Sequence, residues 1–191
     1  MDILLDDLIW MSYNILLAYI PIFLGLRMLQ VKNTTIKLLL GFLWLLFIPN
    51  TIYMLTDIIH LFEDWPSNAL LINLFVFIPL YTTLMIISIL TFIAALLPFE
   101  KVLKQKKVPQ PTRTIIIVLL NCLIAFGVVL GRIQRLNSWD VFLNPEGVIT
   151  NTIHTLTTPS LLALTLLFAV ICNVIYLFYR NSLHELSIHV T

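Results

Sequence analysis

Charged side chains are the scarcest class in this chain. Asp, Glu, Lys and Arg make up 11% of its 191 residues, against 60% hydrophobic residues, whereas about a quarter of an ordinary soluble domain is charged. The net charge of +1 favours no strongly charged partner, and no feature predicts binding to nucleic acid. Several apolar runs reach the roughly 18 to 20 residues that cross a bilayer. The sequence therefore predicts an all-α integral membrane protein embedded in the lipid bilayer.

Cysteines and the features of a signal peptide are also nearly absent. The two cysteines, Cys122 and Cys172, each lie within an apolar run, so we expect small core residues rather than a disulfide. The N-terminal stretch MDILLDDLIW carries three aspartates and no basic residue, whereas a cleavable signal peptide begins with a positively charged region. We therefore expect the first apolar run to remain in the protein as a helix.

Five segments are expected to cross the membrane and to form a single transmembrane domain over residues 1–191. They lie at about residues 8–26, 38–60, 69–97, 114–131 and 159–179. Pro49 should kink the second helix, whereas Pro159 opens the fifth in its first turn, where proline is favoured. Residues 132–158 form an outer interfacial segment, and the apolar tripeptide VFL within it should dip into the outer leaflet.

The charges between these segments predict the orientation of the chain. The loops after the first and third helices carry the lysines, and cytoplasmic loops are enriched in Lys and Arg. The N-terminal tail and the loop after the second helix are acidic. The N-terminus is therefore predicted to lie outside and the C-terminus in the cytoplasm. Trp10, Trp65 and Trp139 fall at the predicted outer boundary, as in an aromatic belt.

A row of polar residues interrupts the second apolar segment. Asn50, Tyr53, Asp57 and His60 are spaced by three, four and three, so a helix places them on one face. Polar groups in such a place are costly unless partnered, and they are functional candidates. Asn50 could instead compensate the kink at Pro49 by a hydrogen bond. Asp57 and His60 are candidate catalytic residues, a carboxylate that orients an imidazole; the alternative is a hydrated helix end.

A second polar motif, GVVLGRIQRLNSWDVFLNP, covers residues 127–145. Arginine on an outer loop goes against the positive-inside trend, so Arg132 and Arg135 point to a carboxylate partner or an anionic ligand. The polar residues that follow are further candidate binding residues: Asn137, Trp139 and Asp140. Ser138 or Asp140 could instead cap a short interfacial helix.

Both motifs are predicted at the same outer surface. Asp57 or Asp140 could pair with Arg132 and tie two helices together, or these charges could belong to a ligand or reaction site. His154, before the fifth helix, could join His60 and an aspartate around a divalent metal ion, or it could be an ordinary surface histidine. The residues specify no cofactor, and the metal remains unknown.

The two motifs carry a resemblance to a known family. The patterns W-x-x-F-x-P-N-x-x-Y-x-x-T-D-x-x-H-L over residues 44–61 and G-R-x-x-R-x-N-S-W-D over residues 131–140 resemble the signature of a bacterial membrane family catalogued as domain of unknown function 1361. The resemblance implies a multi-pass protein of the bacterial plasma or inner membrane, and it implies no activity. It also implies that the signature positions are Pro49, Asn50, Tyr53, Thr56, Asp57, His60, Arg132, Asn137, Trp139 and Asp140.

Three functions remain open. The first is binding or transport of a small anionic solute or lipid head group, held by Arg132 and Arg135; five spans are few for a complete transporter, so a homo-oligomer or membrane partner subunit would complete it. The second is a membrane enzyme acting on an extracytoplasmic or lipid-linked substrate with Asp57 and His60 as an acid–base or metal site, although the chain has no nucleophile elbow, HExxH motif or phosphate loop. The third is an accessory subunit whose polar cluster only locks helices.

Overall fold

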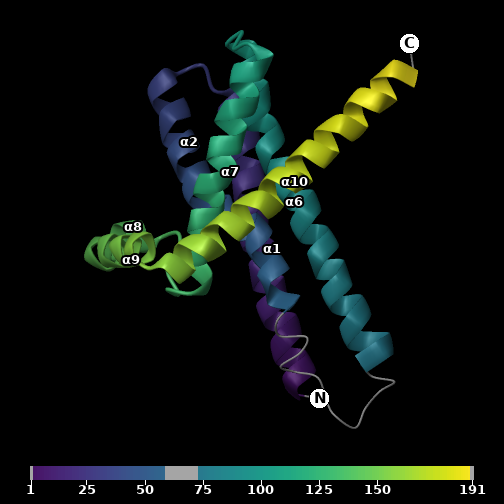
Figure 1. Cartoon of the computed structure of the whole chain (residues 1–191), viewed down its shortest axis with the longest axis vertical. Helices are drawn as coiled ribbons and strands as arrows, with labels where there is room; N and C mark the ends of the chain where they lie inside the picture. Colours follow the sequence, from purple (N-terminus) through teal and green to yellow (C-terminus); the bar gives the residue numbers. More distant parts are fainter. Residues whose placement is uncertain (1, 59–72, 190–191) are drawn as a thin grey trace. The chain divides into compact units, whose positions relative to one another are not determined.

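The computed structural model describes the backbone of residues 2–58 and 73–189, and the side chains of residues 9–58 and 74–181. This part of the chain is helical and has no strand (Figure 1). It contains five helical segments long and apolar enough to cross a membrane: Ile9–Gln30, Thr34–Asp57, Leu74–Gln105, Gln110–Arg132 and Pro159–Asn181. The prediction of an all-α chain with five membrane-spanning helices is confirmed. The orientation of the termini and the single transmembrane domain stay predictions.

The chain divides into two compact units, residues 1–98 and 99–191. The first unit begins with α1 (Asp2–Gln30) and α2 (Thr34–Phe47). In the turn between them, the Asn33 side chain accepts hydrogen bonds from the backbone N–H groups of Thr35 and Ile36 at 2.9 and 3.2 Å. Asparagine is favoured before a helix for this reason. The cap explains why α2 begins at residue 34, inside a polar stretch, rather than at the predicted residue 38.

The second membrane segment is not one continuous α-helix. After α2 it continues as α3 (Pro49–Tyr53) and then as the 3₁₀ helix η1 (Met54–Asp57). Pro49 has no backbone N–H and cannot extend the hydrogen-bond ladder of α2, so the helix is broken where the sequence predicts a kink. The predicted end of this helix at His60 lies outside the described residues.

The third membrane segment extends beyond its predicted end. Its described part consists of the π-helix η2 (Asn73–Phe77) followed by α6 (Ile78–Gln105), with Pro98 inside. The predicted start at residue 69 lies outside the described residues. The predicted end at residue 97 is wrong, because a membrane helix tolerates a proline where neighbouring groups satisfy the freed backbone. The loop predicted over residues 98–113 shrinks to residues 106–109, since α7 (Gln110–Arg132) already includes Pro111 in its first turn.

The turn between α6 and α7 closes α6 with a Schellman motif. The Lys107 N–H donates to the Lys104 carbonyl at 2.9 Å, and the Val108 N–H donates to the Leu103 carbonyl at 3.1 Å. This pair of bonds requires a left-handed conformation at the first donor residue, and Lys107 accordingly has φ of 56°. Glycine would adopt this conformation with less strain.

Apolar side chains of α1, η1 and α6 form a core in the first unit. Met54 is 0% exposed and lies in one cluster with Met11 and Ala18 of α1 and with Tyr81 of α6. Since Met54 belongs to the 3₁₀ turn, this cluster fixes the place of η1 against α1 and α6.

Trp44 of α2 brings three helices of the first unit together. Its indole N–H donates to the Ala95 carbonyl of α6 at 3.0 Å, and its ring is buried. Gly25 of α1 lies beside it: a Cβ at this position would come within 3.1 Å of Pro98 and 3.4 Å of the Trp44 Nε1 atom. The close approach of α1 to Trp44 and Pro98 therefore needs a residue without a side chain.

Gly25→Ala is expected to destabilise the protein by about 1–3 kcal/mol, the range for overpacking a filled core. Gly41→Ala is the matched control, because its added Cβ would meet only the flexible Met28 Sδ at 3.5 Å. In that variant, alanine gains about 1 kcal/mol of helix propensity over glycine. Thermal unfolding in detergent micelles measures both. Equal stability of the two variants would contradict the packing of Gly25.

The core of the second unit lies where α7 meets α10 (Pro159–His189). The Asn121 Nδ2 atom donates to the Asn173 Oδ1 atom at 3.0 Å, and Asn173 in turn donates to the Ala169 carbonyl at 2.9 Å. Such a hydrogen bond between apolar helices holds them in register. Cys122 and Cys172 are free thiols, and Cys172 is fully buried, as expected from the sequence.

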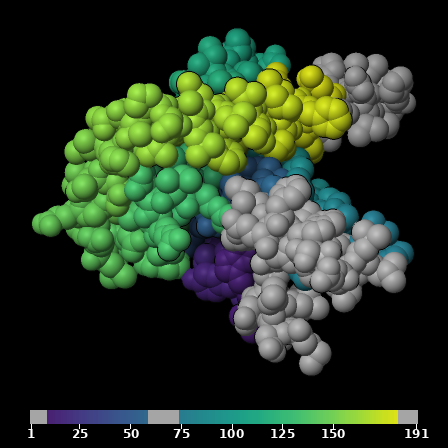
Figure 2. All heavy atoms as spheres, turned by 60° about the horizontal axis from the view of Figure 1, so that its bottom comes forward, coloured from purple at the N-terminus to yellow at the C-terminus, as the bar shows by residue number. Residues whose placement is uncertain are grey.

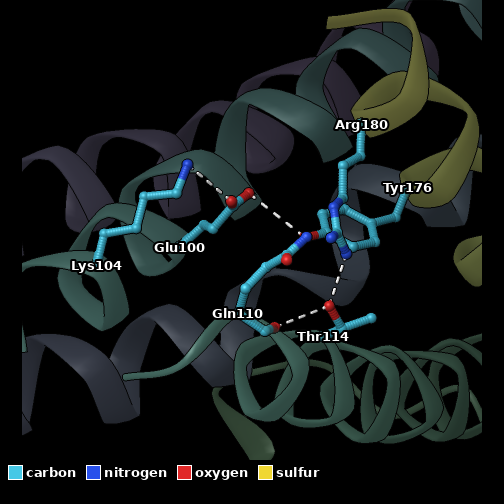
Figure 3. Close-up of polar contacts among 6 residues, drawn as sticks. All are labelled: Glu100, Lys104, Gln110, Thr114, Tyr176 and Arg180. Atoms are coloured by element: carbon cyan, nitrogen blue, oxygen red, sulfur yellow. Dashed lines mark hydrogen bonds and ion pairs between the residues drawn. The ribbon is translucent and has the colours of Figure 1, made fainter. Parts of the chain in front are cut away.

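A polar cluster joins the end of α10 to the neighbouring helix ends (Figure 3). The Tyr176 hydroxyl donates to Glu100 Oε2 at 3.4 Å, and Lys104 forms an ion pair with Glu100 at 2.9 Å. On the next turn of α10, Arg180 donates to the Thr114 hydroxyl at 2.6 Å. These contacts connect α10 to the last turns of α6 and to the first turns of α7. The packing of these helices is enough to explain them.

Two short helices connect α7 to α10. They are α8 (Asp140–Leu143) and α9 (Pro145–Thr157). The Asn144 side chain accepts a hydrogen bond from the Gly147 N–H at 3.1 Å, and Pro145 occupies the first turn of α9, so both favour a helix start here. The sequence predicts an interfacial segment over residues 132–158 but does not predict α9 within it.

Candidate functional site

Side chains donate hydrogen bonds to backbone carbonyls at the kink near Pro49. The Asn50 Nδ2 atom donates to the Phe47 carbonyl at 3.0 Å, and the Thr51 hydroxyl donates to the Ile48 carbonyl at 2.8 Å. The Thr51 N–H also donates to the Ile48 carbonyl, at 3.1 Å, and it therefore leaves the Phe47 carbonyl to the Asn50 side chain. The structural alternative for Asn50, a hydrogen bond at the kink, is therefore present, while its role in binding stays a prediction.

The 3₁₀ turn moves Asp57 off the predicted polar row. Successive side chains are about 120° apart in a 3₁₀ helix and about 100° apart in an α-helix. A single α-helical face shared by Asn50, Tyr53 and Asp57 therefore does not extend through η1. Asn50 and Tyr53 are partly buried, whereas Asp57 is 0% exposed. The spacing alone could not predict this change of helix type.

Asp57 is the most deeply buried of the candidate residues in the described part of the chain. Met54 lies one 3₁₀ turn before it and therefore on the same side of η1, and Met54 packs against Met11 and Tyr81. Asp57 thus faces the interior of the first unit, where it has an interaction partner. A buried carboxylate is costly even when partnered, which keeps Asp57 the leading functional candidate of this motif.

Asn14 of α1 is a buried polar residue that the sequence reasoning missed. It is 9% exposed, and its Nδ2 atom is buried without a hydrogen-bond partner. Met11 and Ala18, three residues before and four after it, belong to the same core cluster as Met54, so Asn14 lies on the face of α1 that is turned toward this cluster. In the sequence, the helical spacing of Asn14 with Met11 and Ala18 inside an apolar run could have indicated its burial. An unsatisfied buried donor costs about 1–3 kcal/mol, which makes Asn14 a further candidate binding residue.

The second motif forms a fixed turn after α7. The backbone N–H of Asn137 donates to Asp140 Oδ2 at 2.6 Å, and the Asp140 N–H donates to the Asn137 carbonyl at 3.0 Å. Reciprocal bonds of this kind resemble those of a capping box at a helix start. Asp140 thus fixes the turn before α8, whereas α8 itself has Trp139 at its N-cap position and no side-chain cap hydrogen bond, so the predicted cap by Asp140 is not formed. Trp139 lies half-buried in this turn. Binding by Asn137, Trp139 and Asp140 stays a prediction.

The two arginines of this motif differ in their surroundings. Arg132 is the last residue of α7 and is half-buried, whereas Arg135 is exposed and has φ of 54°. The left-handed conformation costs a residue other than glycine about 1–2 kcal/mol. The Leu136 N–H donates to the Leu130 carbonyl at 3.2 Å across this turn, so the conformation at Arg135 has a structural cause, as it has at Lys107. The exposure of the guanidinium within the motif makes Arg135 a functional candidate. Its fork of N–H donors suits a carboxylate or phosphate group.

His154 lies on the surface of α9. Its Nδ1 atom is 3.0 Å from the Gln134 Nε2 atom, which joins α9 to the turn after α7. Over residues 9–58 and 74–181, no three His, Cys, Asp or Glu side chains come together as a metal site would require. His60 lies outside these ranges, so an acid–base or metal site that includes it stays a prediction.

The family comparison agrees with the two motifs. A family model described as a protein of unknown function, DUF1361, matches residues 13–175, a range that contains both of them. The chain belongs to the DUF1361 family. No curated protein and no solved structure matches it. Membership confirms the resemblance seen in the sequence, and with the five apolar helices it supports a multi-pass membrane protein. It assigns no activity to this DUF1361 chain.

Proposed function

We propose that this DUF1361 protein is a binding or transport component of the bacterial plasma membrane, with an extracytoplasmic polar site for a small anionic solute or lipid head group. The observation that carries the proposal is Arg135, an exposed arginine in a left-handed conformation within a signature motif. The adjacent turn is fixed by the hydrogen bonds between Asn137 and Asp140. A rigid turn that presents a guanidinium is suited to recognising an anion.

The other candidate residues fit this function in different ways. Arg132 adds a second positive charge at the end of α7, one turn before Arg135. In the first unit, the buried Asp57 and the unpaired Asn14 amide place polar groups within apolar helices. Polar groups at such positions mark the path of a solute or proton in many membrane proteins. A homo-oligomer or a partner subunit would complete the small bundle as a transporter.

A membrane enzyme is the second candidate function, and the burial of Asp57 favours it. A carboxylate shielded from water is a suitable general acid or base, and His60 follows it by three residues in the sequence. The substrate would be extracytoplasmic or lipid-linked.

The local roles of Asn50 and Asp140 support instead an accessory subunit in which these residues only stabilise turns.

Arg135→Gly is expected to abolish stabilisation of the protein by anions and to leave the fold intact. Glycine adopts a positive φ without strain, so the variant removes the guanidinium and spares the backbone. An anion that binds the folded state raises the unfolding temperature. The probes are inorganic phosphate, glycerol 1-phosphate, and phosphatidylglycerol compared with phosphatidylcholine. Lys107→Gly is the matched control, since it also removes one positive charge from a left-handed residue, with φ of 56°.

The control separates a specific site from a general effect of charge. A response lost in Arg135→Gly and kept in Lys107→Gly would support the anion site. Responses lost equally in both variants would show that only net charge matters. If no probe raises the unfolding temperature of the unmodified protein, the anion-binding proposal is contradicted.

A further inference from the structure

The helix α9 exposes an apolar stripe along its length. Ile149, Ile153 and Leu156 are 60%, 56% and 53% exposed, and their spacing of four and three places them on one side of the helix. Phe142 and Leu143 of the preceding α8 are also exposed. Neighbouring helices of the second unit do not cover this stripe, so it needs an apolar surrounding that the protein itself does not supply.

The remaining surface of α9 is divided into two further sides. At about 100° per residue, the side chains of Glu146, Thr150, His154 and Thr157 form an exposed polar side next to the apolar stripe. Asn151 and Thr155 lie on the third side, which is buried or partly buried. There the Asn151 amide donates to the Gly147 carbonyl and the Thr155 hydroxyl donates to the Asn151 carbonyl, at 2.9 and 2.8 Å.

Three sides of this kind fit a helix at the surface of a bilayer. One side packs on protein, one meets the hydrocarbon and one meets water, whereas a spanning helix would have no exposed polar side. The neighbours of α9 agree with this placement. It contacts α7 and α10, which are two of the membrane-spanning helices. Leu162 and Leu166 of α10 are exposed as well.

We propose that α8 and α9 form an interfacial element that rests in one leaflet of the bilayer, with lipid acyl chains against Phe142, Leu143, Ile149, Ile153 and Leu156. Figure 2 shows this segment, in green, at the surface of the molecule. The element would hold the turn of residues 135–140 at the level of the lipid head groups. Transfer of five such side chains from water into hydrocarbon is favourable and holds the element in the leaflet.

Nitroxide labels at two matched positions test this placement. Ile153→Cys lies on the apolar stripe and Thr150→Cys on the polar side, and both side chains are exposed, so neither change removes a core contact. The full chain is reconstituted in vesicles of phosphatidylethanolamine and phosphatidylglycerol. The unsubstituted protein, treated in the same way, gives the background of Cys122 and Cys172. Collision rates are measured with oxygen, which concentrates in hydrocarbon, and with a water-soluble nickel chelate.

The label at residue 153 is expected to collide several-fold more with oxygen than with the chelate, and the label at residue 150 is expected to show the reverse. Equal access of the chelate to both positions would place α9 in water and overturn the proposal. A label at residue 153 that is shielded from both reagents would show that another protein, and not lipid, covers the stripe, and it would equally overturn the proposal. None of these outcomes depends on anion binding at Arg135.

Discussion

Asp57→Ala is expected to destabilise the protein by about 3–5 kcal/mol. This is the usual cost of removing one member of a buried charged pair, because the other member is left without its partner. Asp57 is fully buried and is not without an interaction partner. The methyl group of alanine also leaves part of the space of the carboxylate unfilled in a core that contains Met54 and Tyr81. Unfolding in detergent micelles, followed by circular dichroism, measures the loss. A change below about 0.5 kcal/mol, as at an ordinary surface position, would contradict a partnered and buried carboxylate.

Asp57→Asn separates function from stability at the same position. Asparagine keeps the volume and can still form hydrogen bonds, so we expect a folded protein with a smaller loss of stability. If the carboxylate serves only to hold the fold, this variant should respond to anions as the unmodified protein does. One alternative that the sequence leaves open is that Asp57 and Arg132 compensate each other's charge. That alternative is supported if Asp57→Asn with Arg132→Gln is more stable than the sum of the two single changes allows.

Trp44→Ala is expected to lower the free energy of unfolding by about 3–5 kcal/mol, as is usual for truncating a large buried aromatic residue. The ring of Trp44 is 2% exposed, and its indole N–H reaches the Ala95 carbonyl at 3.0 Å. Trp44→Phe keeps most of the apolar contact and loses the hydrogen bond. It should cost about 0.5–1.5 kcal/mol for the lost hydrogen bond, in addition to the small cost of a volume-conserving change in a core. Similar stabilities of the Ala and Phe variants would show that the ring does not fill the space between α1, α2 and α6.

The Trp44→Phe variant also tests whether Trp44, the first residue of the signature pattern, has a role in binding. Trp44 opens the motif that contains Asp57, yet its contacts are structural. We therefore expect Trp44→Phe to keep its response to anions at temperatures where it is folded. A loss of response without a loss of stability would place Trp44 in the binding machinery and would contradict the structural assignment.

The class and the membrane segments could be predicted from the sequence because they depend on the length of apolar runs. A run of about 20 apolar residues has few alternatives to a spanning helix. The break at Pro49 was predictable for a similar reason, since proline always lacks its N–H. The predicted end of the third helix at residue 97 was wrong, because α6 continues through Pro98 to Gln105. Local sequence does not show whether neighbouring groups in the fold will compensate a proline.

The candidate site was less accessible to sequence reasoning because it depends on helix type. The spacing of Asn50, Tyr53 and Asp57 implies one face only if the helix is regular, and the 3₁₀ turn η1 changes the direction of Asp57. Asn14 gave no strong signal, since one asparagine in an apolar run is common in membrane helices. Its burial depends on how α1 packs into the core cluster that contains Met11, Ala18 and Met54. The conformation of Arg135 likewise depends on the turn that follows α7.

Labelling of Ser138→Cys in whole cells tests most directly the central claim of an outward-facing anion site. Ser138 lies in the turn between Arg135 and Asp140 and is partly exposed, so an impermeant maleimide should reach it from outside, and glycerol 1-phosphate should slow the reaction. Lys104→Cys on the predicted cytoplasmic side should stay unlabelled until the cells are opened, and the unsubstituted protein gives the background of Cys122 and Cys172. Labelling of Lys104→Cys but not of Ser138→Cys, or labelling of Ser138→Cys at the same rate with and without the anion, would contradict the claim.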